Sequence, residues 1–494
     1  MTAITYEAPW PVYALAWSSS LEQSGAAGSG ADAKDTQSLP DGARLAIGSF
    51  VEEYSNRIQV LGTDSAHRVS VLADALHPYP PTKLGFQPST MHDERRESSS
   101  KSADWGGVGM STSFSSHSSI SSVSSGSSTA DLSDTDTDSY PDSELLASSA
   151  DCLRIWSIDR NDEFDINSEY GSMSLRARHA KRREPRTKFA LQERSVLAHN
   201  KGTASPAPLT SFSWNAPSPN LIVTSSIDTT CTVWDLPTRT ALTQLIAHDR
   251  EVYDVDWCPG SSDVFASVGA DGSVRVFDLR SLEHSTIIYE TTGTPSTPGS
   301  PMQNTPLLRI VFNPWDANYL ATFHLESHTV QILDVRAPGS PILELKGHSS
   351  AVNSMAWGAP SHNVSRNGPS KGMICTGGDD AQCLVYDLAS STLRSASAQG
   401  RRSRNSMRAS PANDLRIGAE VPVLAYTAPS MVNNVVWLRS PLSLRRAPQS
   451  RPSSFYRSLL QEWTDFTSTS TTQGTGNSDW LALCAGRAVK MLRV

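Results

Sequence analysis

The sequence lacks the patterns on which several classes of protein depend. Cysteine is scarce, at 6 of 494 residues, and no Cys-x-x-Cys pair or Cys/His spacing typical of structural zinc is present. No run reaches the roughly 20 apolar residues that a membrane-spanning helix requires. The opening MTAITYEAPWPVYALAW has no basic segment followed by an apolar core, so it does not predict a signal peptide. These absences predict a protein of the cytoplasm and nucleus, with reduced cysteines and without bound metal or membrane contact.

The sequence also has no excess of positive charge and none of the common catalytic motifs. Lys and Arg number 42 against 50 Asp and Glu, and the formal net charge of −8 argues against direct nucleic-acid binding, which needs excess cations against phosphate. There is no Gly-rich phosphate loop and no Gly-x-Ser-x-Gly elbow. Histidines such as His77, His92 and His117 have no partner at a useful spacing. We therefore predict no catalysis and no cofactor; an enzyme is the rival reading that these absences disfavour.

Apolar residues are few for a chain of this length. They make up 38% of the sequence, and the mean hydropathy is −0.33. A single domain over residues 1–494 with long polar inserts fits this composition better than several compact domains. The predicted inserts are polar, Ser-rich or Arg/Ser-rich and bury too little apolar area to order, so we expect disordered loops. They cover residues 18–40, 89–142, 160–191, 291–306, 390–419 and 439–478.

Three features of the inserts each have two interpretations. Six Ser or Thr residues precede proline and are either targets of proline-directed kinases or ordinary loop dipeptides: Thr294, Thr297, Ser300, Thr305, Ser410 and Ser440. The basic run Arg176–Lys188 is either a nuclear import signal or a solvated loop. The segment Ser454–Trp463 has apolar residues at helical spacing and either docks on a partner or packs back on its own domain.

Internal repetition gives the strongest signal for the fold. The clearest unit is His248–Arg280, with three predicted strands at Val252–Trp257, Val264–Val268 and Ser273–Leu279. Two further units align well with it, Leu209–Leu236 and Gly347–Leu388. Weaker copies bring the number of units to seven and cover Val12–Leu61, Pro81–Ile158, Leu307–Arg336 and Met431–Val494.

These units predict an all-β, seven-bladed β-propeller. Each alternates apolar and polar residues and is rich in β-branched and aromatic types, as half-buried strands require. Trp234 and the equivalent Phe277 are 43 residues apart, within the window of about 40–45 residues for propeller repeats. One such unit cannot bury both faces of its sheet, so the units stack radially. We expect Ile4–Tyr6 to pair beside Val489–Leu492 and close the ring.

Four residue types recur at fixed offsets in three units. A Ser or Thr precedes an Asp by four residues, an aromatic residue follows the Asp by six, and a His lies upstream. The three sets are His248, Ser267, Asp271 and Phe277; His348, Thr376, Asp380 and Tyr386; and His199, Thr224, Asp228 and Trp234. The pattern resembles that of the WD-repeat family, which implies a hydrogen-bond chain within a blade from Asp to His, His to Ser/Thr, and Ser/Thr to the aromatic. Phe277 has no donor, so its chain must be shorter.

A hydrolytic Ser-His-Asp triad is the competing interpretation of these sets. A triad is recognised by its geometry and not by its content. Three copies in one repeat register favour the structural role.

Longer motifs narrow the resemblance. AHDREVYDVDWCP, FNPWDANYLATF, VNSMAWGAP, MICTGGDDAQCLVYDL and YEAPWPVYALAWS are similar to a small family of WD-repeat scaffolds that contains the plant transparent-testa-glabra protein and the animal cullin-4-associated factor seven. The resemblance spans nearly all blades except the inserts. It implies a scaffold that binds dual-specificity tyrosine-regulated kinases or transcription regulators, and for some members a role as substrate receptor of a cullin-4 ubiquitin ligase.

Substrate receptors of cullin-4 ligases carry a motif at the end of a blade's third strand. It is an aromatic or apolar residue followed by Asp-x-Arg. Two consecutive units match it, with Asp278 and Arg280 in one and Asp334 and Arg336 in the next. Either each Arg contacts an acidic site on the ligase adaptor, or it caps a neighbouring carboxylate. We thus expect a non-catalytic adaptor, monomeric within hetero-complexes. The alternative is a structural subunit of another nuclear complex, associated with chromatin or RNA.

Overall fold

The computed structural model describes eleven stretches of the chain. They are residues 3–18, 42–52, 55–63, 68–88, 144–160, 187–198, 207–291, 304–358, 372–388, 418–438 and 480–494. All of them belong to one compact unit, Met1–Ser89 with Ser143–Val494, whereas the second unit, Thr90–Asp142, lies outside the described residues. Every regular element in the described stretches is a β-strand.

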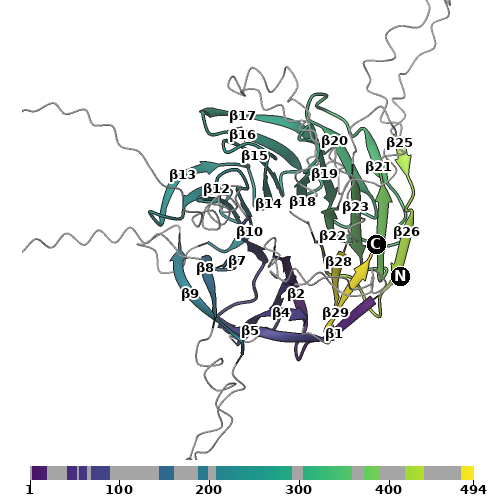
Figure 1. Cartoon of the computed structure of the whole chain (residues 1–494). Helices are drawn as coiled ribbons and strands as arrows, with labels where there is room; N and C mark the ends of the chain where they lie inside the picture. Colours follow the sequence, from purple (N-terminus) through teal and green to yellow (C-terminus); the bar gives the residue numbers. More distant parts are fainter. Residues whose placement is uncertain are drawn as a thin grey trace, which may run out of the picture. The chain divides into compact units, whose positions relative to one another are not determined.

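The strands form seven sheets set around a ring, which confirms the predicted seven-bladed propeller (Figure 1). We number the blades in chain order and name their strands from the ring centre outward. Blade 1 contains β2 (Val12–Trp17), β3 (Arg44–Ser49), β4 (Asn56–Thr63) and β5 (Val69–His77). Blade 2 contains β6 (Lys83–Phe86), β7 (Glu144–Ser149), β8 (Leu153–Arg160) and β9 (Phe189–Leu197). Blade 3 contains β10 (Leu209–Trp214), β11 (Leu221–Ser226), β12 (Thr230–Asp235) and β13 (Thr240–Ile246).

The other four blades follow the same order. Blade 4 contains β14 (Val252–Trp257), β15 (Val264–Gly269), β16 (Ser273–Asp278) and β17 (Ser281–Glu290). Blade 5 contains β18 (Leu307–Phe312), β19 (Tyr319–His324), β20 (Val330–Asp334) and β21 (Leu343–Leu345), to which β25 (Gly418–Glu420) adds in parallel. Blade 6 contains β22 (Val352–Trp357), β23 (Met373–Gly378), β24 (Gln382–Asp387) and β26 (Leu424–Thr427). Blade 7 contains β27 (Asn434–Trp437), β28 (Trp480–Ala485), β29 (Ala488–Arg493) and β1 (Ala3–Glu7).

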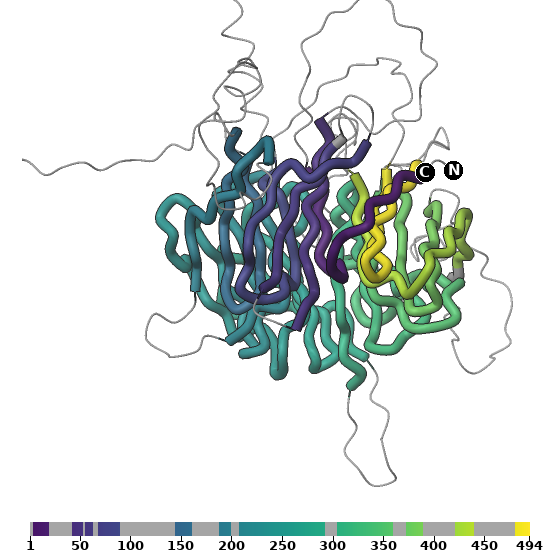
Figure 2. Tube along the Cα trace, turned by 90° about the horizontal axis from the view of Figure 1, so that it is seen from below, coloured from purple at the N-terminus to yellow at the C-terminus, as the bar shows by residue number. Residues whose placement is uncertain are grey.

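The first and last strands close the ring together. β1 pairs antiparallel with β29, and Ile4, Thr5 and Tyr6 lie opposite Met491, Lys490 and Val489. Figure 2 shows this purple strand alongside the yellow end of the chain. The predicted closure is confirmed, and it leaves β29 without an unpaired edge.

The apolar core is divided among the interfaces between neighbouring blades. Seven clusters of buried side chains each join two adjacent blades, including blade 7 with blade 1. Between blades 3 and 4, for example, Val223 and Val233 pack with Val255 and Phe265, all fully buried. No blade holds a core of its own, so the blades are stable only when stacked around the ring.

Each inner strand ends in an aromatic residue: Trp17, Phe86, Trp214, Trp257, Phe312, Trp357 and Trp437. Two of these tryptophans donate across a blade interface. Trp257 Nε1 lies 3.0 Å from Ser213 O, and Trp357 Nε1 lies 3.2 Å from Val311 O. The aromatic ends therefore fix the angle between neighbouring blades through both area and hydrogen bonds.

The outer strands were not predicted, apart from β1. The clearest unit was expected to have three strands, but its sheet has a fourth, β17, and blade 3 likewise has β13. Both outer strands are largely exposed, so their sequences do not show the apolar alternation by which strands were identified. Two predicted inserts also have wrong bounds, because each includes residues that form a strand. The insert 160–191 includes Phe189–Leu191, which begins β9, and the insert 390–419 includes Gly418 and Ala419, which belong to β25.

The connections between strands leave two distinct faces. We call turn face the side that carries the turns between second and third strands and the links from one blade to the next. We call insert face the opposite side, where inner strands lead to second strands and third strands to outer ones. Five of the six predicted inserts join strand ends on the insert face, and residues 291–306 join strand ends on the turn face.

Candidate functional site

The blade 4 set of WD-type residues comes together in the structure. His248 Nδ1 lies 2.9 Å from Asp271 Oδ1, and His248 Nε2 lies 2.7 Å from Ser267 Oγ. Phe277 offers no donor and instead stacks on Phe265, with ring centroids 5.1 Å apart. The chain of hydrogen bonds therefore runs from the turn carboxylate through the imidazole and does not reach the aromatic residue.

Blade 6 repeats the arrangement and adds a phenol. His348 Nδ1 lies 3.0 Å from Asp380 Oδ1, and Nε2 lies 2.7 Å from Thr376 Oγ1. The Tyr386 hydroxyl donates to Lys346 O at 3.3 Å and also hydrogen-bonds Thr376. Burial raises the pKa of Tyr386 to about 12, so the hydroxyl stays protonated.

The structure describes three of the four residues of the blade 3 set. Trp234 Nε1 donates to Thr224 Oγ1 at 3.0 Å, the bond that phenylalanine cannot make in blade 4. Asp228 Oδ1 accepts from the backbone N–H of Thr230 at 3.1 Å and from its hydroxyl at 2.6 Å. His199 lies outside the described residues.

Blade 2 contains a further set that the sequence analysis missed. His77 Nε2 lies 3.1 Å from Ser148 Oγ, which also accepts from Trp156 Nε1 at 2.9 Å. The turn Asp151 pairs with Arg154 rather than with the histidine. His77 therefore does have a partner, contrary to expectation. The long stretch between His77 and Ser148 hid the relation, although the Ser-x7-Trp spacing from Ser148 to Trp156 was visible.

The turn that carries each Asp requires a left-handed backbone. In blade 4 the residue after the Asp is Gly272, at φ 76°, which glycine tolerates. Blades 3 and 6 place Thr229 and Ala381 there, at φ 73° and 59°. Non-glycine residues are strained in this region, so these turns are held by the hydrogen bonds to the neighbouring Asp.

Burial and hydrogen bonding set the charge of these groups. Burial opposes ionisation of Asp271, but bonds from His248 and from the Ser273 backbone and hydroxyl outweigh it and hold the pKa of the carboxyl well below its usual range. Burial lowers the pKa of His77 to about 4, against the opposing effect of its bond to Tyr79 O. Asp271 is therefore ionised and His77 neutral near pH 7.

Each set joins residues within one blade, and its burial favours a structural role over a hydrolytic one. Ser267 is fully buried, and His248 is 1% exposed. A nucleophile must reach a substrate carbonyl, and no substrate reaches the Ser267 hydroxyl within an intact blade. The sets thus specify the fold, as satisfied buried networks do.

Two carboxylates of β14 tie blade 4 to both of its neighbours. Asp254 accepts from the Ser211 hydroxyl of blade 3 at 2.5 Å and from the Ile310 backbone N–H of blade 5 at 3.0 Å. Asp256 repeats the contact with blade 3 by accepting from Ser213 at 2.8 Å. These inter-blade bonds, which the sequence did not indicate, fix three consecutive blades at the ring centre.

The turn face exposes apolar side chains on several blades. They lie in turns or blade-to-blade links, and between 41% and 56% of each is exposed: Phe50, Tyr79, Ile227, Leu325 and Met431. The loops that carry them are short and anchored in rigid sheets, the arrangement in which propellers and other scaffolds present binding groups.

The two Asp-x-Arg arginines lie on the insert face, in the links that follow β16 and β20. Arg280 Nε and Nη2 lie 2.9 and 2.6 Å from the two oxygens of Asp278. Arg336 makes the same fork with Asp334, at 2.8 and 2.7 Å. Its Nη2 also donates to the Tyr319 hydroxyl at 2.9 Å. Each guanidinium therefore caps a carboxylate of its own blade, and about a third of each side chain stays exposed.

Comparison with known proteins places this architecture in a family. The family model of the WD domain, G-beta repeat, matches residues 195–235, 239–278 and 339–387. The DDB1- and CUL4-associated factor 7 homolog of Dictyostelium discoideum is 37% identical over 387 residues, covering 78% of this chain and 84% of that protein. This chain belongs to that family of WD-repeat proteins.

Two fungal relatives of this family member are nearly as similar. A WD repeat-containing protein of Schizosaccharomyces pombe is 36% identical over 78% of this chain and 69% of its own length. A WD repeat-containing protein of Saccharomyces cerevisiae is 36% identical over 70% of this chain and 55% of its own length. The three matched segments of the family model cover the inner three strands of blades 3, 4 and 6, where the residue sets follow the WD pattern most closely.

The remaining predicted residues of this WD-repeat protein fall mostly outside the described stretches. Thr305 is the one described phosphorylation candidate, and its carbonyl accepts from Thr291 Oγ1 at 3.0 Å. The other five, Thr294, Thr297, Ser300, Ser410 and Ser440, lie outside the described residues, as does the segment 454–463. Of the basic run Arg176–Lys188, only Thr187 and Lys188 are described.

The described residues hold no group of three or more His, Cys, Asp or Glu side chains placed to bind a metal ion. All six cysteines are free and buried. Among the described elements there is no helix with the length and apolar character to cross a bilayer.

Proposed function

We propose that this protein is a non-catalytic scaffold that uses the two faces of its propeller for different partners. The turn face holds a dual-specificity tyrosine-regulated kinase or a transcription regulator. The insert face contacts the adaptor of a cullin-4 ubiquitin ligase through Arg280 and Arg336. We place this activity in the cytoplasm and nucleus.

The observation that carries the scaffold role is the combination of a rigid ring with exposed apolar turns. Seven inter-blade clusters and the β14 carboxylates hold the sheets in fixed positions. Phe50, Ile227 and Met431 remain at least 45% exposed on the turn face. Exposed apolar groups on a preorganised surface are typical of protein-binding sites, because little ordering is needed on binding.

The ligase contact is supported by family membership and by the position of the two arginines. The name of the Dictyostelium relative associates that protein with DDB1 and CUL4. Arg280 and Arg336 lie in equivalent links of neighbouring blades, each partly exposed. Because the fork of each Arg already holds its own Asp, a partner carboxylate would bind the Nη atoms that face away from that Asp, and Tyr319 would hold Arg336 in place.

Affinity purification followed by mass spectrometry tests the scaffold role with the full chain. We expect a kinase or a transcription regulator, together with a ligase adaptor, among the enriched proteins. Recovery of none of these classes would overturn the proposal.

The ligase contact is tested separately by the double variant Arg280→Glu and Arg336→Glu. We expect it to lose the ligase adaptor and keep the turn-face partners. The control is Arg194→Glu, which removes a similarly exposed Arg that pairs with Asp159 in blade 2. Undiminished recovery of the adaptor with the double variant would show that the two arginines do not contact it.

A further inference from the structure

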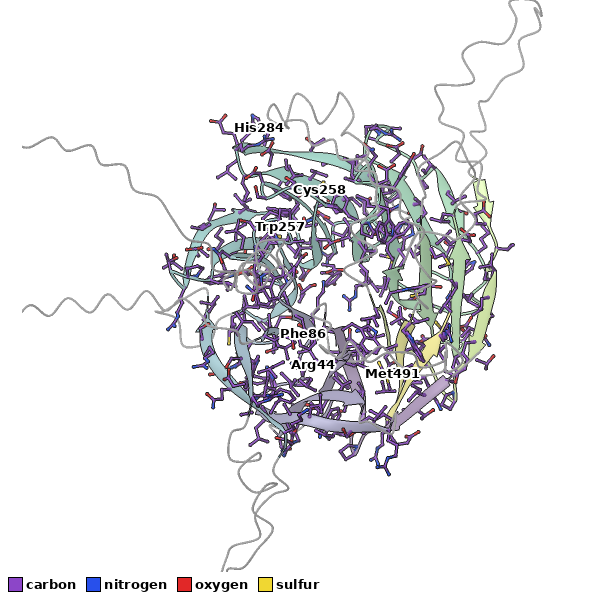
Figure 3. The ribbon with its side chains drawn as sticks, in the orientation of Figure 1. Arg44, Phe86, Trp257, Cys258, His284 and Met491 are labelled. Atoms are coloured by element: carbon purple, nitrogen blue, oxygen red, sulfur yellow. The ribbon has the colours of Figure 1, made fainter. Side chains whose placement is uncertain are left out.

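The outer strands of the blades form the perimeter of the ring (Figure 1). In every blade except blade 5 the outer strand is the last of its sheet, and no described strand pairs with its outward edge. Figure 3 labels His284 of β17 at this perimeter, farther from the ring centre than Trp257 of β14. An unpaired edge can take up a further strand, and charged residues, short length or a covering segment protect most such edges.

Among the described sheets, six of the seven outer edges have one of these protections. β5 contains Asp74, and β9 contains Glu193 and Arg194. β17 contains Glu283 and Glu290. β1 and β26 have only five and four residues, and β25 covers the edge of β21. The remaining outer strand is β13 of blade 3.

None of these three protections applies to β13. Its seven residues, TALTQLI, include no charged residue and no proline. Its pairing with β12 shifts register once, between Ala241 and Thr243, and is regular from Thr243 to Ile246. At about 3.4 Å per residue, the strand presents an edge about 24 Å long. Such an edge is a template on which another strand can form main-chain hydrogen bonds.

Two large apolar side chains lie on the exposed face of β13. Leu242 is 57% exposed and Ile246 is 81% exposed, the highest value among the large hydrophobic residues that the structure describes. Gln244 lies between them on the same face, because alternate residues of a strand share a face. On the other face, Leu245 is half-buried against the cluster that blades 3 and 4 share. A strand paired with this edge would therefore shelter Leu242 and Ile246 from water.

The two ends of β13 carry opposite charges. Arg239 is exposed in the turn just before the strand. Beyond the other end, the Asp249 side chain is 81% exposed although it pairs with Arg275. Asp228 is exposed at that same end, in the turn before β12. When two copies of this edge lie antiparallel, the positive end of each copy lies beside the negative end of the other.

We propose that β13 pairs antiparallel with β13 of a second copy of this chain. A two-fold axis keeps the exposed face of one β13 on the same side as that of the other. With the axis at Gln244, Leu242 of each copy lies opposite Ile246 of the other, and two sheets join into one. The opposite charges at the two ends favour a second copy over an unrelated strand, because only the copy brings the matching order of charges with certainty.

The dimer goes beyond the proposed scaffold function and does not depend on it. It differs from the monomer expected from the sequence. Because the paired strands are antiparallel, the turn faces of the two copies point in opposite directions. Each dimer would thus present two copies of every binding face to different partners.

Sedimentation velocity of the purified full chain tests the dimer. We expect a monomer–dimer equilibrium between about 1 and about 100 μM, because one strand edge makes a small interface. Leu242→Lys with Ile246→Lys should weaken it at least about tenfold, since like charges then meet across the edge. Val196→Lys, at a 48% exposed position of β9, is the matched control and should dimerise normally. Arg239→Asp should weaken the dimer several-fold, and adding Asp249→Arg should restore it.

A disulfide tests the register. Gln244 lies opposite its own copy at the two-fold axis, so Gln244→Cys should form a disulfide-linked dimer under mild oxidation while the six buried native cysteines stay reduced. Thr240→Cys is the control on the same strand. In this register the two copies of residue 240 are about 27 Å apart, so they should not cross-link.

Three results would overturn the β13 dimer: a monomer at every concentration, unchanged dimerisation of the folded double Lys variant, or equal cross-linking of Gln244→Cys and Thr240→Cys. An unchanged urea midpoint shows that the Lys variant is folded, since both positions are exposed. A monomeric chain that still recovers a kinase or a transcription regulator would leave the scaffold role standing and the dimer wrong.

Discussion

Replacing Asp271 with Ala should destabilise the protein far more than replacing its exposed neighbour Asp249. Asp271 accepts from the His248 imidazole at 2.9 Å, and His248 is 1% exposed, so water cannot easily take the place of the carboxylate. A hydrogen bond to a charged group contributes about 1.5–3 kcal/mol, and the orphaned N–H of His248 adds about 1 kcal/mol. Arg275 also pairs with Asp271, but it keeps its pair with Asp249 when Asp271 is replaced, so the loss there is small. We therefore expect Asp271→Ala to lower the free energy of unfolding by about 3 kcal/mol.

Asp249→Ala is the matched control, because Asp249 also pairs with Arg275 but its side chain is 81% exposed. An exposed ion pair contributes about 0–1 kcal/mol. Urea unfolding of both variants and of the unaltered chain, followed by tryptophan fluorescence, measures the two losses. Because the pKa of Asp271 is lowered in the folded state, its contribution is present above the usual carboxyl pKa and is lost as pH falls through the folded value. Equal midpoints for the two variants near pH 7 would refute a structural role for the His248–Asp271 pair.

Three further predictions concern other blades. Trp234→Phe removes the indole donor to Thr224 and should lower the free energy of unfolding by about 1–2 kcal/mol in urea titrations; no loss would mean that Thr224 is satisfied without it. Burial lowers the pKa of His77 from its usual 6.5 to about 4, so the unfolded state takes up a proton at a higher pH than the folded state does. The contribution of neutral His77 to the free energy of unfolding is therefore fully present above pH 6.5 and should fall by about 3 kcal/mol as the pH drops to 4. His77→Gln should remove that part of the pH dependence, and identical pH profiles would contradict it. Thr229→Gly relieves a β-branched residue at φ 73° and should raise the urea midpoint by an amount equivalent to about 0.5 kcal/mol; a lower midpoint would argue against strain in that turn.

Much of the fold could be predicted because the inner three strands of a blade are buried and alternate. Val252–Trp257 was predicted at the bounds that β14 has. The pairing of β1 with β29 was predicted because Ile4–Tyr6 was the one strand candidate that no unit had used. The outer strands β13 and β17 escaped because their exposed positions mix Thr, Gln, Glu and Ser with isolated apolar residues. Sequence patterns record burial, and these strands have little of it.

The candidate site was predicted less completely, because its key contacts join residues that are distant in sequence. The WD sets of blades 4 and 6 recur at short spacing and were visible, whereas His77 is separated from Ser148 by an insert. The Tyr13–Arg309 contact joins blades 1 and 5 through the channel, so no local motif could indicate it. The arginines of the Asp-x-Arg motifs were identified, but the closed fork that each makes with its own Asp required the geometry of the link.

Closure of the ring by β1 is the claim on which the rigid scaffold depends, and a cross-strand disulfide tests it most directly. Thr5 lies opposite Lys490 in the register of β1 and β29. The double variant Thr5→Cys and Lys490→Cys should form an intramolecular disulfide under mild oxidation, detected by mass spectrometry, while the six buried native cysteines stay reduced. The out-of-register pair Thr5→Cys and Arg493→Cys should not cross-link. Failure of the first pair to form the bond, or equal yields from both pairs, would contradict a closed ring.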